Sequence, residues 1–367
     1  MVSAWLAAAC RSPVAPRDGA LSALSLHELG APVIKAVLAQ AGLTAEDVDE
    51  LIVSNALGAG GNPARVLALA AGLPERVAGL SIDRQCAGGL DAVVLARQMV
   101  LAGAADVVVA GGVESYSRRP LRLRRFADGR APEAYEQAEF TPWPDRDPDM
   151  AEAAQALGAL LGIGREAQDA WAMASHAKAR AHAAAAGEII PLAGLTADAF
   201  TRDLRPALCR RAKILTGDIT TANTAVAADG AGFVVVVSER AARQLRAPVQ
   251  EILGGATRGG TPDMPGLAPV AAIEHVLATA GRTPRDLQAA EVMEAYAVQA
   301  IACVRGAGID PQIVNTGGGA LARGHPVGAS GAINAVRLFH TLRRTGGTGL
   351  AAIAAAGGLG TALLLSA

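Results

Sequence analysis

The sequence of 367 residues has few cysteines, few aromatic residues and almost no net charge. Its four cysteines, Cys10, Cys86, Cys209 and Cys303, are widely separated and form no C-x-x-C pair, which excludes a disulfide framework and the common zinc and redox motifs. We therefore expect no metal site and a reducing compartment, the cytoplasm. The 33 basic and 34 acidic residues nearly cancel, which argues against nucleic acid or an acidic membrane surface as a partner.

Long apolar runs are also missing. The N-terminal stretch MVSAWLAAACRSPVAPRDG lacks a basic leader region and is too short to span a bilayer, so we interpret it as a first strand. No later stretch reaches membrane-spanning length without interruption, which predicts a soluble protein without a membrane partner. The hydrophobic fraction of 51% nevertheless predicts a large buried core, and aromatic residues at 3% make that core aliphatic.

Two segments 239 positions apart (276 − 37) repeat one pattern. Residues 33–51 read VIKAVLAQAGLTAEDVDEL, and residues 272–290 read AIEHVLATAGRTPRDLQAA. Each predicts an amphipathic helix that ends at a glycine, followed by a Thr-x-x-Asp turn that leads to an apolar segment. The matching positions indicate an internal duplication.

The segments after Cys86 and after His325 also share a layout. Each predicts a buried helix, a glycine turn and an apolar strand, which ends at Gly111-Gly112 in the first case and at Gly357-Gly358 in the second. Short apolar strands that alternate with helices predict an α/β fold of buried, largely parallel sheets covered by helices. The duplication predicts a pseudo-two-fold molecule with a site between its halves.

The stretch from about Ser117 to Lys213 interrupts this pattern. It begins with RRPLRLRR, continues through the polar FTPWPDRDPDM and becomes alanine-rich and helical, which predicts an inserted domain. We therefore divide the chain into an N-terminal half (1–117 and 214–246), an inserted loop or lid domain (118–213) and a C-terminal half (247–367).

Cys86 and His325 are the candidate reactive residues. Cys86 lies in SIDRQCAGGL, between a predicted strand and a predicted helix, where a helix N-terminus favours the thiolate. His325 lies at the corresponding place of the second half, in the glycine-rich NTGGGALARGHPVGASG. A two-fold relation brings both residues to one centre, as a nucleophile and its base. The alternative is a small buried cysteine and a structural histidine.

These motifs together resemble the thiolases, which are acyl-coenzyme A acyltransferases of the condensing-enzyme superfamily. The resemblance covers nearly the whole chain and rests on CRSP, GNPAR, DRQCAGGL, AGGVES, REAQDAWAMASHAKA and NTGGGALARGHPVGASGA. It implies two βαβαβαββ halves in a layered α/β/α/β/α sandwich, with the loop domain over the coenzyme A site. It also implies a homodimer or homotetramer that uses acyl-CoA and coenzyme A as substrates and binds no cofactor covalently.

The resemblance assigns roles to individual residues. Cys86 is the nucleophile that carries the acyl group, His325 is its base, and the backbone N–H groups of Cys86 and Ala356 stabilise the oxyanion. The positions expected to contact substrate or coenzyme A are Asn223, Ala225, Ala295 and Tyr296.

Three positions depart from the family's pattern. Met293 replaces the asparagine of the Asn-Glu-Ala-Phe motif, and its thioether cannot donate a hydrogen bond to an oxyanion. Ala354 replaces the second cysteine, which acts as acid and base at the α-carbon, and Ala225 replaces a serine that contacts coenzyme A. The loop domain also lacks the usual His-Met pair. The resemblance therefore implies an acyltransferase with a non-standard carbon–carbon step; the alternative is a turnover-deficient thiolase-like subunit or acyl-CoA-binding partner of another chain.

The remaining candidates are expected to be mainly structural. Two basic runs, 118–125 and 202–213, either meet coenzyme A phosphates or form a solvated or subunit-contact surface. Glu114 and Glu294 are expected to be buried carboxylates, and Cys10, Cys209 and Cys303 to be structural. The Gly357 turn lacks a G-x-G-x-x-G pattern and no Walker A motif occurs, which excludes a nucleotide-binding α/β protein.

Overall fold

The structure is a computed structural model that describes residues 3–58 and 60–367. Residues 1, 2 and 59, which the predicted N-terminal half includes, lie outside the described residues. The predicted first strand is confirmed as β1 (Ala4–Arg11). In the described part of the chain, no helix has both the length and the apolar character that a membrane span requires.

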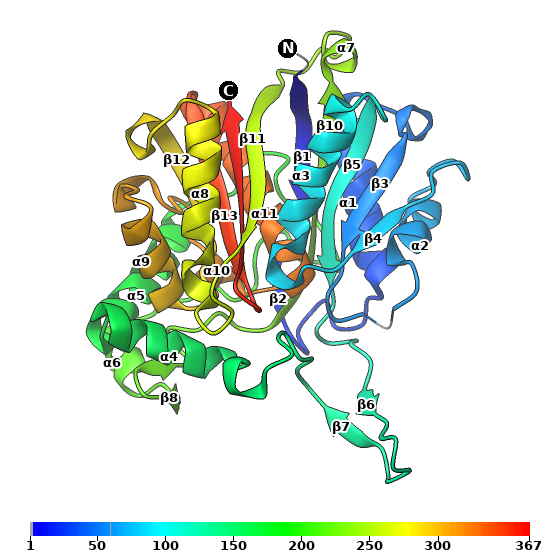
Figure 1. Ribbon diagram of the computed structural model, residues 1–367. Coiled ribbons are helices and arrows are strands. Elements are labelled where there is room, and N and C mark those ends of the chain that lie inside the picture. The colour runs from blue at the N-terminus through cyan, green and yellow to red at the C-terminus, as the bar shows by residue number, and fades with distance from the viewer. Residues whose placement is uncertain (1–2, 59) are drawn as a thin grey trace.

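The described residues form one ten-stranded sheet and two short hairpins (Figure 1). Besides β1, the main sheet contains β2 (Ala15–Pro16), β3 (Glu50–Ser54), β4 (Leu80–Ile82), β5 (Val107–Glu114), β10 (Ala228–Ser238), β11 (Gln250–Gly259), β12 (Leu287–Val292), β13 (Thr348–Ala355) and β14 (Leu359–Ser366). The hairpins are β6 (Arg122–Arg124) with β7 (Glu133–Tyr135), and β8 (Ile214–Thr216) with β9 (Ile219–Thr220).

The helices differ widely in length. They are α1 (Leu26–Ala41), α2 (Pro63–Ala70), α3 (Gly88–Leu101), α4 (Met150–Leu161), α5 (Arg165–Ala181), α6 (Pro206–Arg210), α7 (Glu239–Ala242), α8 (Ala268–Thr279), α9 (Ala297–Gly306), α10 (Ala320–Arg323) and α11 (Val327–Thr345). The longest of them, α11, follows the His325 loop and is buried along almost its whole length.

The order of the main sheet is symmetric about its centre. The strands run β4-β3-β5-β10-β1-β11-β14-β13-β12, and the two halves join where β1 pairs with β11. Figure 1 shows the strands of the two halves side by side, blue to green in the first and yellow to red in the second. The sheet order therefore carries the duplication that the sequence predicts.

The expectation of largely parallel sheets is wrong. Only β3–β4, β3–β5 and β12–β13 are parallel, whereas the other pairs along this order are antiparallel. The turn 356–358 joins β13 to β14, and so short a connection can only join antiparallel neighbours. Gly357 and Gly358, predicted to end a strand, lie in that turn with φ of 76° each. An apolar run marks a buried strand but leaves its direction open.

The repeated helix and turn are confirmed in both halves. Helix α1 ends at Gly42, whose φ is 73°, and Thr44 then donates its backbone N–H to Asp47 at 2.7 Å. In the second half, Gly281 has a φ of 61°, and Thr283 donates its N–H to Asp286 at 2.7 Å. Strands β3 and β12 follow these turns, so the same local chemistry sets the start of both.

Alternate residues of the strands pack into different layers. On β5, Val107 and Val109 pack with α1 and α2, whereas Val108 and Ala110 pack with α3 and α11. On β13, alternate residues likewise pack with α8 and α9 or with α3 and α11. Helices α3 and α11 thus lie between the two halves of the main sheet, which gives the α/β/α/β/α arrangement.

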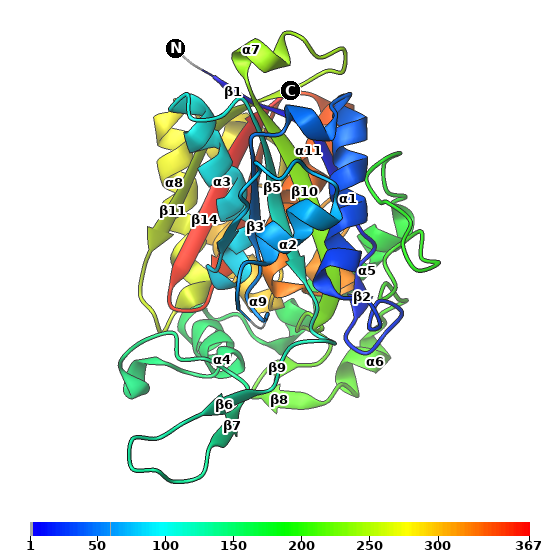
Figure 2. The ribbon, with the colours of Figure 1, turned by 90° about the vertical axis from the view of Figure 1, so that its right-hand side faces the viewer.

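The inserted segment, residues 118–213, lies mostly at one end of the molecule. Figures 1 and 2 show the β6–β7 hairpin projecting from this end, away from the main sheet. Helix α4 packs through Leu157 on Val298 and Ile301 of α9, and Ala172 of α5 packs with Leu321 of α10. These contacts hold the helical part of the segment against the C-terminal half.

The two central helices approach each other at glycines. A Cβ added at Gly89 of α3 would lie 2.7 Å from the backbone nitrogen of Ala332, and one added at Gly331 of α11 would lie 2.5 Å from that of Leu90. Backbone atoms cannot move aside as the end of a side chain can. Glycine is therefore required at both positions because of space rather than dihedral angle.

We predict that Gly331→Ala destabilises the fold by about 1–3 kcal/mol, because overpacking pushes the central helices apart. Urea unfolding of both proteins measures the difference. The matched control is Gly259→Ala, an exposed strand position where an added Cβ meets no atom within 4 Å. Equal stability of Gly331→Ala and the parent protein would show that the helices can separate without cost.

Candidate active site

The turn before α3 contains Cys86 and has an unusual backbone conformation at the residue before it. Gln85 has a φ of 50°, which is rare for a residue other than glycine, and Asp83 supports the turn by accepting the Gln85 N–H at 2.8 Å. A Cβ at Gly88 would lie 2.1 Å from the Ser54 hydroxyl oxygen, so the glycine after the turn lets α3 begin close to β3. The thiol therefore stands at the start of a central helix.

The loop 315–325 positions His325 at the start of the other central helix. The backbone N–H of His325 donates to the carbonyl of Val226 at 2.8 Å, and Gly324 before it has a φ of 108°. His325 Nε2 lies 3.2 Å from Cys86 Sγ. The structure thus brings together the two residues that the sequence pairs through its internal symmetry.

Ser330 fixes the orientation of the imidazole, and the sequence reasoning missed it. Its hydroxyl donates to the carbonyl of Pro326 at 3.0 Å, so its oxygen is free to accept a hydrogen bond from His325 Nδ1 at 2.7 Å. The proton is then on Nδ1, and the unprotonated Nε2 faces the Cys86 thiol. The available signal was the position of Ser330 one turn into the predicted helix after His325.

Burial keeps the cysteine–histidine pair neutral. It raises the pKa of the Cys86 thiol to about 12, with small further contributions from the charges of Glu114 and Asp83. It also lowers the pKa of His325 to about 4. The expected preference for the thiolate at the helix start is therefore outweighed by loss of solvation, and both side chains are uncharged at pH 7.

Two buried carboxylates brace the site, as expected of Glu114 and Glu294. Glu114 accepts the backbone N–H groups of Ala56 and Gly328 at 3.0 Å each, which ties the loop after β3 to the start of α11. Burial raises its pKa to about 7.

Glu294 performs the same bracing on the other side of the site. It accepts hydrogen bonds from Ser175 Oγ at 2.7 Å, Asn315 Nδ2 at 2.8 Å and Leu321 N at 3.2 Å. These bonds hold the loop 315–325 against α5, so the histidine loop is anchored from the inserted segment as well as from β12.

A cavity of about 410 Å³ opens beside the reactive pair. The sequence-predicted residues on its wall are Cys86, Ala225, Ala295, Tyr296, His325 and Ala356. Ala354, where the resemblance expects a second cysteine, also lies on this wall. Met293 is instead buried in the core around α3 and is 1% exposed.

The structure does not bring Asn223 to the cavity wall. Its side chain is fully buried and already bonded: Oδ1 accepts from Thr220 N at 2.8 Å, while Nδ2 donates to Asp169 and to the Asp218 carbonyl. Asn223 therefore stabilises the conformation of the segment 218–225 without lining the cavity. That segment reaches the wall through Ala225, whose N–H donates to the Ala295 carbonyl at 2.9 Å.

Further polar groups stand on the wall beside the predicted Tyr296, and the sequence reasoning missed Tyr116, Thr224 and Gln299. The phenols of Tyr116 and Tyr296 line the cavity, and burial raises the pKa of both. Thr224 Oγ1 and Gln299 Nε2 are buried and have no hydrogen-bond partner among the described residues. Unsatisfied buried donors beside a cavity are the groups that a ligand can satisfy. Arg119 and Arg122 are the members of the two basic runs that reach the wall.

Metal ligands do not gather in the described part of the chain: it contains no group of three or more His, Cys, Asp or Glu side chains placed to hold an ion. The chemistry that the described site offers is a neutral thiol–imidazole pair at the edge of a largely apolar cavity.

Comparison with known proteins gives one consistent result. Residues 4–240 match the profile of the thiolase N-terminal domain and residues 246–367 that of the thiolase C-terminal domain. The putative acetyl-CoA C-acetyltransferase YhfS of Bacillus subtilis is 39% identical over 360 residues, covering 95% of this chain and 94% of that protein. The acetyl-CoA acetyltransferase of Cupriavidus necator is 38% identical over 404 residues, covering 99% of each.

Solved structures agree with these sequence matches. The Acat5 thiolase from Ascaris suum, in complex with coenzyme A, superimposes with a TM-score of 0.90 at 29% identity and covers 99% of both chains. Human mitochondrial 3-ketoacyl-CoA thiolase, also in complex with coenzyme A, gives a TM-score of 0.90 at 30% identity and covers 100% of this chain and 98% of that one.

We predict that iodoacetamide alkylates Cys86 before the other cysteines, because Cys86 lines the cavity whereas Cys10, Cys209 and Cys303 are buried. With its pKa raised to about 12, the thiolate fraction and the alkylation rate rise about tenfold per pH unit between pH 7 and 9. Peptide mapping after limiting reagent measures site and rate. Dominant labelling elsewhere, or a rate already constant at pH 7, would contradict the neutral pair.

Proposed function

We propose that this chain, which belongs to the thiolase family and is a thiolase-type acyltransferase, works through an acyl-Cys86 thioester with coenzyme A as co-substrate. The observation that carries the proposal is the 3.2 Å separation of Cys86 Sγ and His325 Nε2 on the wall of a 410 Å³ cavity. A nucleophile within hydrogen-bond distance of an oriented base is the arrangement that acyl transfer requires.

The neutral state of the pair defines the first step. As Cys86 Sγ attacks the thioester carbonyl, its proton passes to His325 Nε2, while Ser330 holds the proton on Nδ1. Because burial keeps the pKa of His325 low, the imidazolium is short-lived and returns its proton to the departing thiolate. We assign the developing oxyanion to the backbone N–H groups of Cys86 and Ala356, which lie on the same wall.

The cavity wall also suggests how an acyl-CoA is held. The small side chains of Ala225 and Ala295 leave room for an extended ligand, and Gln299 Nε2 offers a donor to its amide carbonyls. Arg119 and Arg122 stand where the wall reaches the inserted segment and fit the phosphates, although Arg119 also pairs with Glu136. In this proposal Asn223 acts indirectly, by holding the segment that ends at Ala225.

The carbon–carbon step is proposed to be non-standard. Neither Ala354 nor Met293 can move a proton, and loss of a positioned acid or base typically costs about 10²–10⁴-fold in rate. The phenols on the wall belong to Tyr116 and Tyr296, and their raised pKa values keep both protonated at pH 7. A phenol can donate a proton to an enolate, and the resulting phenolate takes a proton back in the reverse direction, so each tyrosine is a candidate acid for a slow carbon–carbon step and neither sets its direction.

Further expectations follow from the family. We propose a cytoplasmic homodimer or homotetramer with no covalently bound cofactor, in which residues 118–213 form the loop domain over the substrate. The second candidate function is a turnover-deficient subunit or acyl-CoA-binding partner of another chain, which the apolar side chains of Ala225, Met293 and Ala354 favour.

We predict that incubation with a panel of acyl-CoAs adds one acyl group to Cys86, visible as an intact-mass increase. Cys86→Ala and His325→Ala each abolish the adduct, because one removes the nucleophile and the other its base, while both fold normally by circular dichroism. The matched control, Cys209→Ala, removes a buried cysteine off the cavity wall and retains the adduct. Undiminished acylation of His325→Ala would place the base elsewhere, and no adduct with any acyl-CoA favours the silent subunit.

We predict that acetoacetyl-CoA thiolysis is slow in this protein and that Ala354→Cys with Met293→Asn raises the rate by about 10²-fold. Because both groups act on one transition state, the rate increases of the two single variants, taken together, are smaller than the rate increase of the double variant. Steady-state rates of all four proteins measure this, with Ala354→Ser as a control of similar size but weaker acidity. Thermal melting checks each variant, since Met293→Asn buries an amide in the core. A parent protein as fast as ordinary thiolases would refute the idea.

A further inference from the structure

A second cavity, of about 140 Å³, borders the loop 315–325 and shares no wall residue with the active-site cavity. Three buried guanidinium groups contribute to its wall, from strand β1, helix α10 and helix α11. The wall residues that carry the argument are Arg11, His182, Asp198, Gly317, Arg323 and Arg337. This concentration of buried positive charge has no part in the acyl-transfer steps proposed above.

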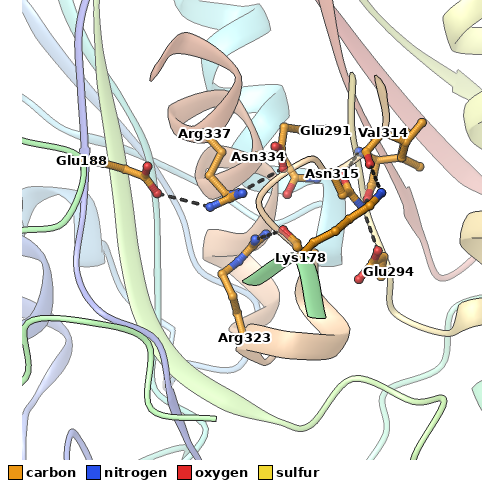
Figure 3. A network of polar contacts seen from close by, with 12 residues as sticks. Lys178, Glu188, Glu291, Glu294, Val314, Asn315, Arg323, Asn334 and Arg337 are labelled. Atoms are coloured by element: carbon orange, nitrogen blue, oxygen red, sulfur yellow. Dashed lines mark hydrogen bonds and ion pairs between the residues drawn. The ribbon is translucent and has the colours of Figure 1, made fainter. Parts of the chain in front are cut away.

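Two of the three arginines form ion pairs with carboxylates. Arg11 donates to Glu188 at 2.9 Å and forms two bonds with Asp198, at 2.7 and 3.0 Å. Arg337 lies between Glu188 and Glu291, with its Nε 3.1 Å from Glu291 and its Nη1 3.4 Å from Glu188 (Figure 3). The three acidic groups of this cluster are therefore gathered around Arg11 and Arg337.

Arg323 has no such partner. Its side chain is 3% exposed, yet in the described part of the chain its guanidinium forms no ion pair and donates a single hydrogen bond, from Nη1 to the Gly318 carbonyl at 2.5 Å. A guanidinium carries five N–H donors, and a buried charge is costly unless it is paired. Burial, and after it the charge of Arg337, lower the pKa of Arg323 to about 10, while the charges of Glu291 and Asp198 oppose this shift. Arg323 therefore remains charged at pH 7.

Arg337 and His182 add further donors to the wall. Arg337 Nη2 is directed toward Gly317, because a Cβ at that glycine would lie 2.6 Å from it, and 2.6 Å from Cδ2 of His182. Burial lowers the pKa of His182, with Arg337 and Arg344 as further causes, so its ring is neutral at pH 7 and supplies one N–H. Among the described residues, the carboxylate on this wall belongs to Asp198, and Arg11 already holds it.

The cavity is open to solutes of modest size. Ala184 and Ala197 on its wall are exposed to solvent, so the interior can be reached from the surface. Its volume corresponds to roughly four or five water molecules, which is also the room that one small oxyanion needs. Planar guanidinium groups bind carboxylate and phosphate oxygens through paired, charge-assisted hydrogen bonds.

We propose that this cavity binds one small oxyanion, of the size of phosphate or a short carboxylate, between the guanidinium of Arg323 and Nη2 of Arg337. The bound oxyanion supplies the acceptors that Arg323 lacks. Because Arg323 also holds the Gly318 carbonyl, the oxyanion stabilises the loop 315–325, and His325 lies two residues beyond Arg323. Arg323 is in this sense a positioning residue that acts through the loop. The site does not depend on the proposed acyl-transfer function.

Isothermal titration calorimetry with inorganic phosphate tests the proposal, with sulfate, formate and chloride as parallel titrants. We expect one phosphate per chain in the parent protein and a loss of affinity of at least about tenfold, which is about 1.4 kcal/mol, in Arg323→Met. The matched control, Arg344→Met, removes an exposed positive charge of the same region from outside the wall and keeps the parent affinity. Tighter binding of formate than of phosphate identifies a carboxylate as the occupant. Equal affinity for chloride would show that the site does not select oxyanions and would contradict the proposal.

Hydrogen exchange measures the effect on the loop without any activity assay. We expect phosphate to slow exchange of the amides in residues 315–325 in the parent protein and in Arg344→Met, and not in Arg323→Met. If Arg323→Met fails to fold, Arg323→Lys is used in its place. Lysine keeps the positive charge but lacks the paired donors of a guanidinium, so we expect a soluble protein with weaker affinity for phosphate. No saturable heat in the parent protein, or equal affinity in Arg323→Met, would overturn the proposal and leave the cavity filled by water.

Discussion

The close contact of α3 and α11 is the constraint on which the rest of the structure depends. Each helix begins two residues after a candidate reactive residue, Cys86 in one half and His325 in the other. Because Gly89 and Gly331 let the two backbones touch, the starts of the helices meet and leave sulfur and nitrogen 3.2 Å apart. The main sheet supports this contact from both sides, since its strand order is symmetric about the β1–β11 junction. The cysteine–histidine pair is therefore a product of how the halves pack rather than of any local motif.

The same burial that creates the site sets its chemistry. Loss of solvation keeps Cys86 protonated and His325 neutral, although a thiol at a helix start is otherwise easier to ionise. A preformed ion pair would have to be desolvated inside the protein, whereas a neutral pair separates charge only while the proton moves and the substrate carbonyl accepts the negative charge. In the acyl transfer proposed above, the backbone N–H groups of Cys86 and Ala356 are assigned to the developing negative charge, and such backbone donors need little reorganisation.

The sequence predicted the features that depend on local or repeated patterns and missed the features that depend on burial. The Thr44–Asp47 and Thr283–Asp286 turns, the central helices and the meeting of Cys86 with His325 follow from periodicity and duplication. Strand direction does not, because an apolar run fits parallel and antiparallel neighbours equally. The charge state of Cys86 depends on its burial in the folded protein, and Arg323 becomes a buried charge with no ion-pair partner among the described residues through packing near residues 11, 182 and 317. Such environments bring together distant segments, so no short motif describes them.

The loop 315–325 shows why these buried polar groups matter. Its backbone turns through left-handed angles at Asn315, whose φ is 47°, and at Gly318 and Gly324, which are residue types that adopt such angles at little cost. Tertiary hydrogen bonds then fix the loop in place. Glu294 and Ser175 hold its middle, Lys178 binds the Val314 carbonyl at 2.8 Å before it, and Arg323 holds the Gly318 carbonyl (Figure 3). In a low-dielectric interior each of these bonds is strong only while its partners remain paired. The position of His325 is thus set by a polar network that reaches well beyond the active-site cavity, and a group that completes that network acts on the histidine without touching the substrate.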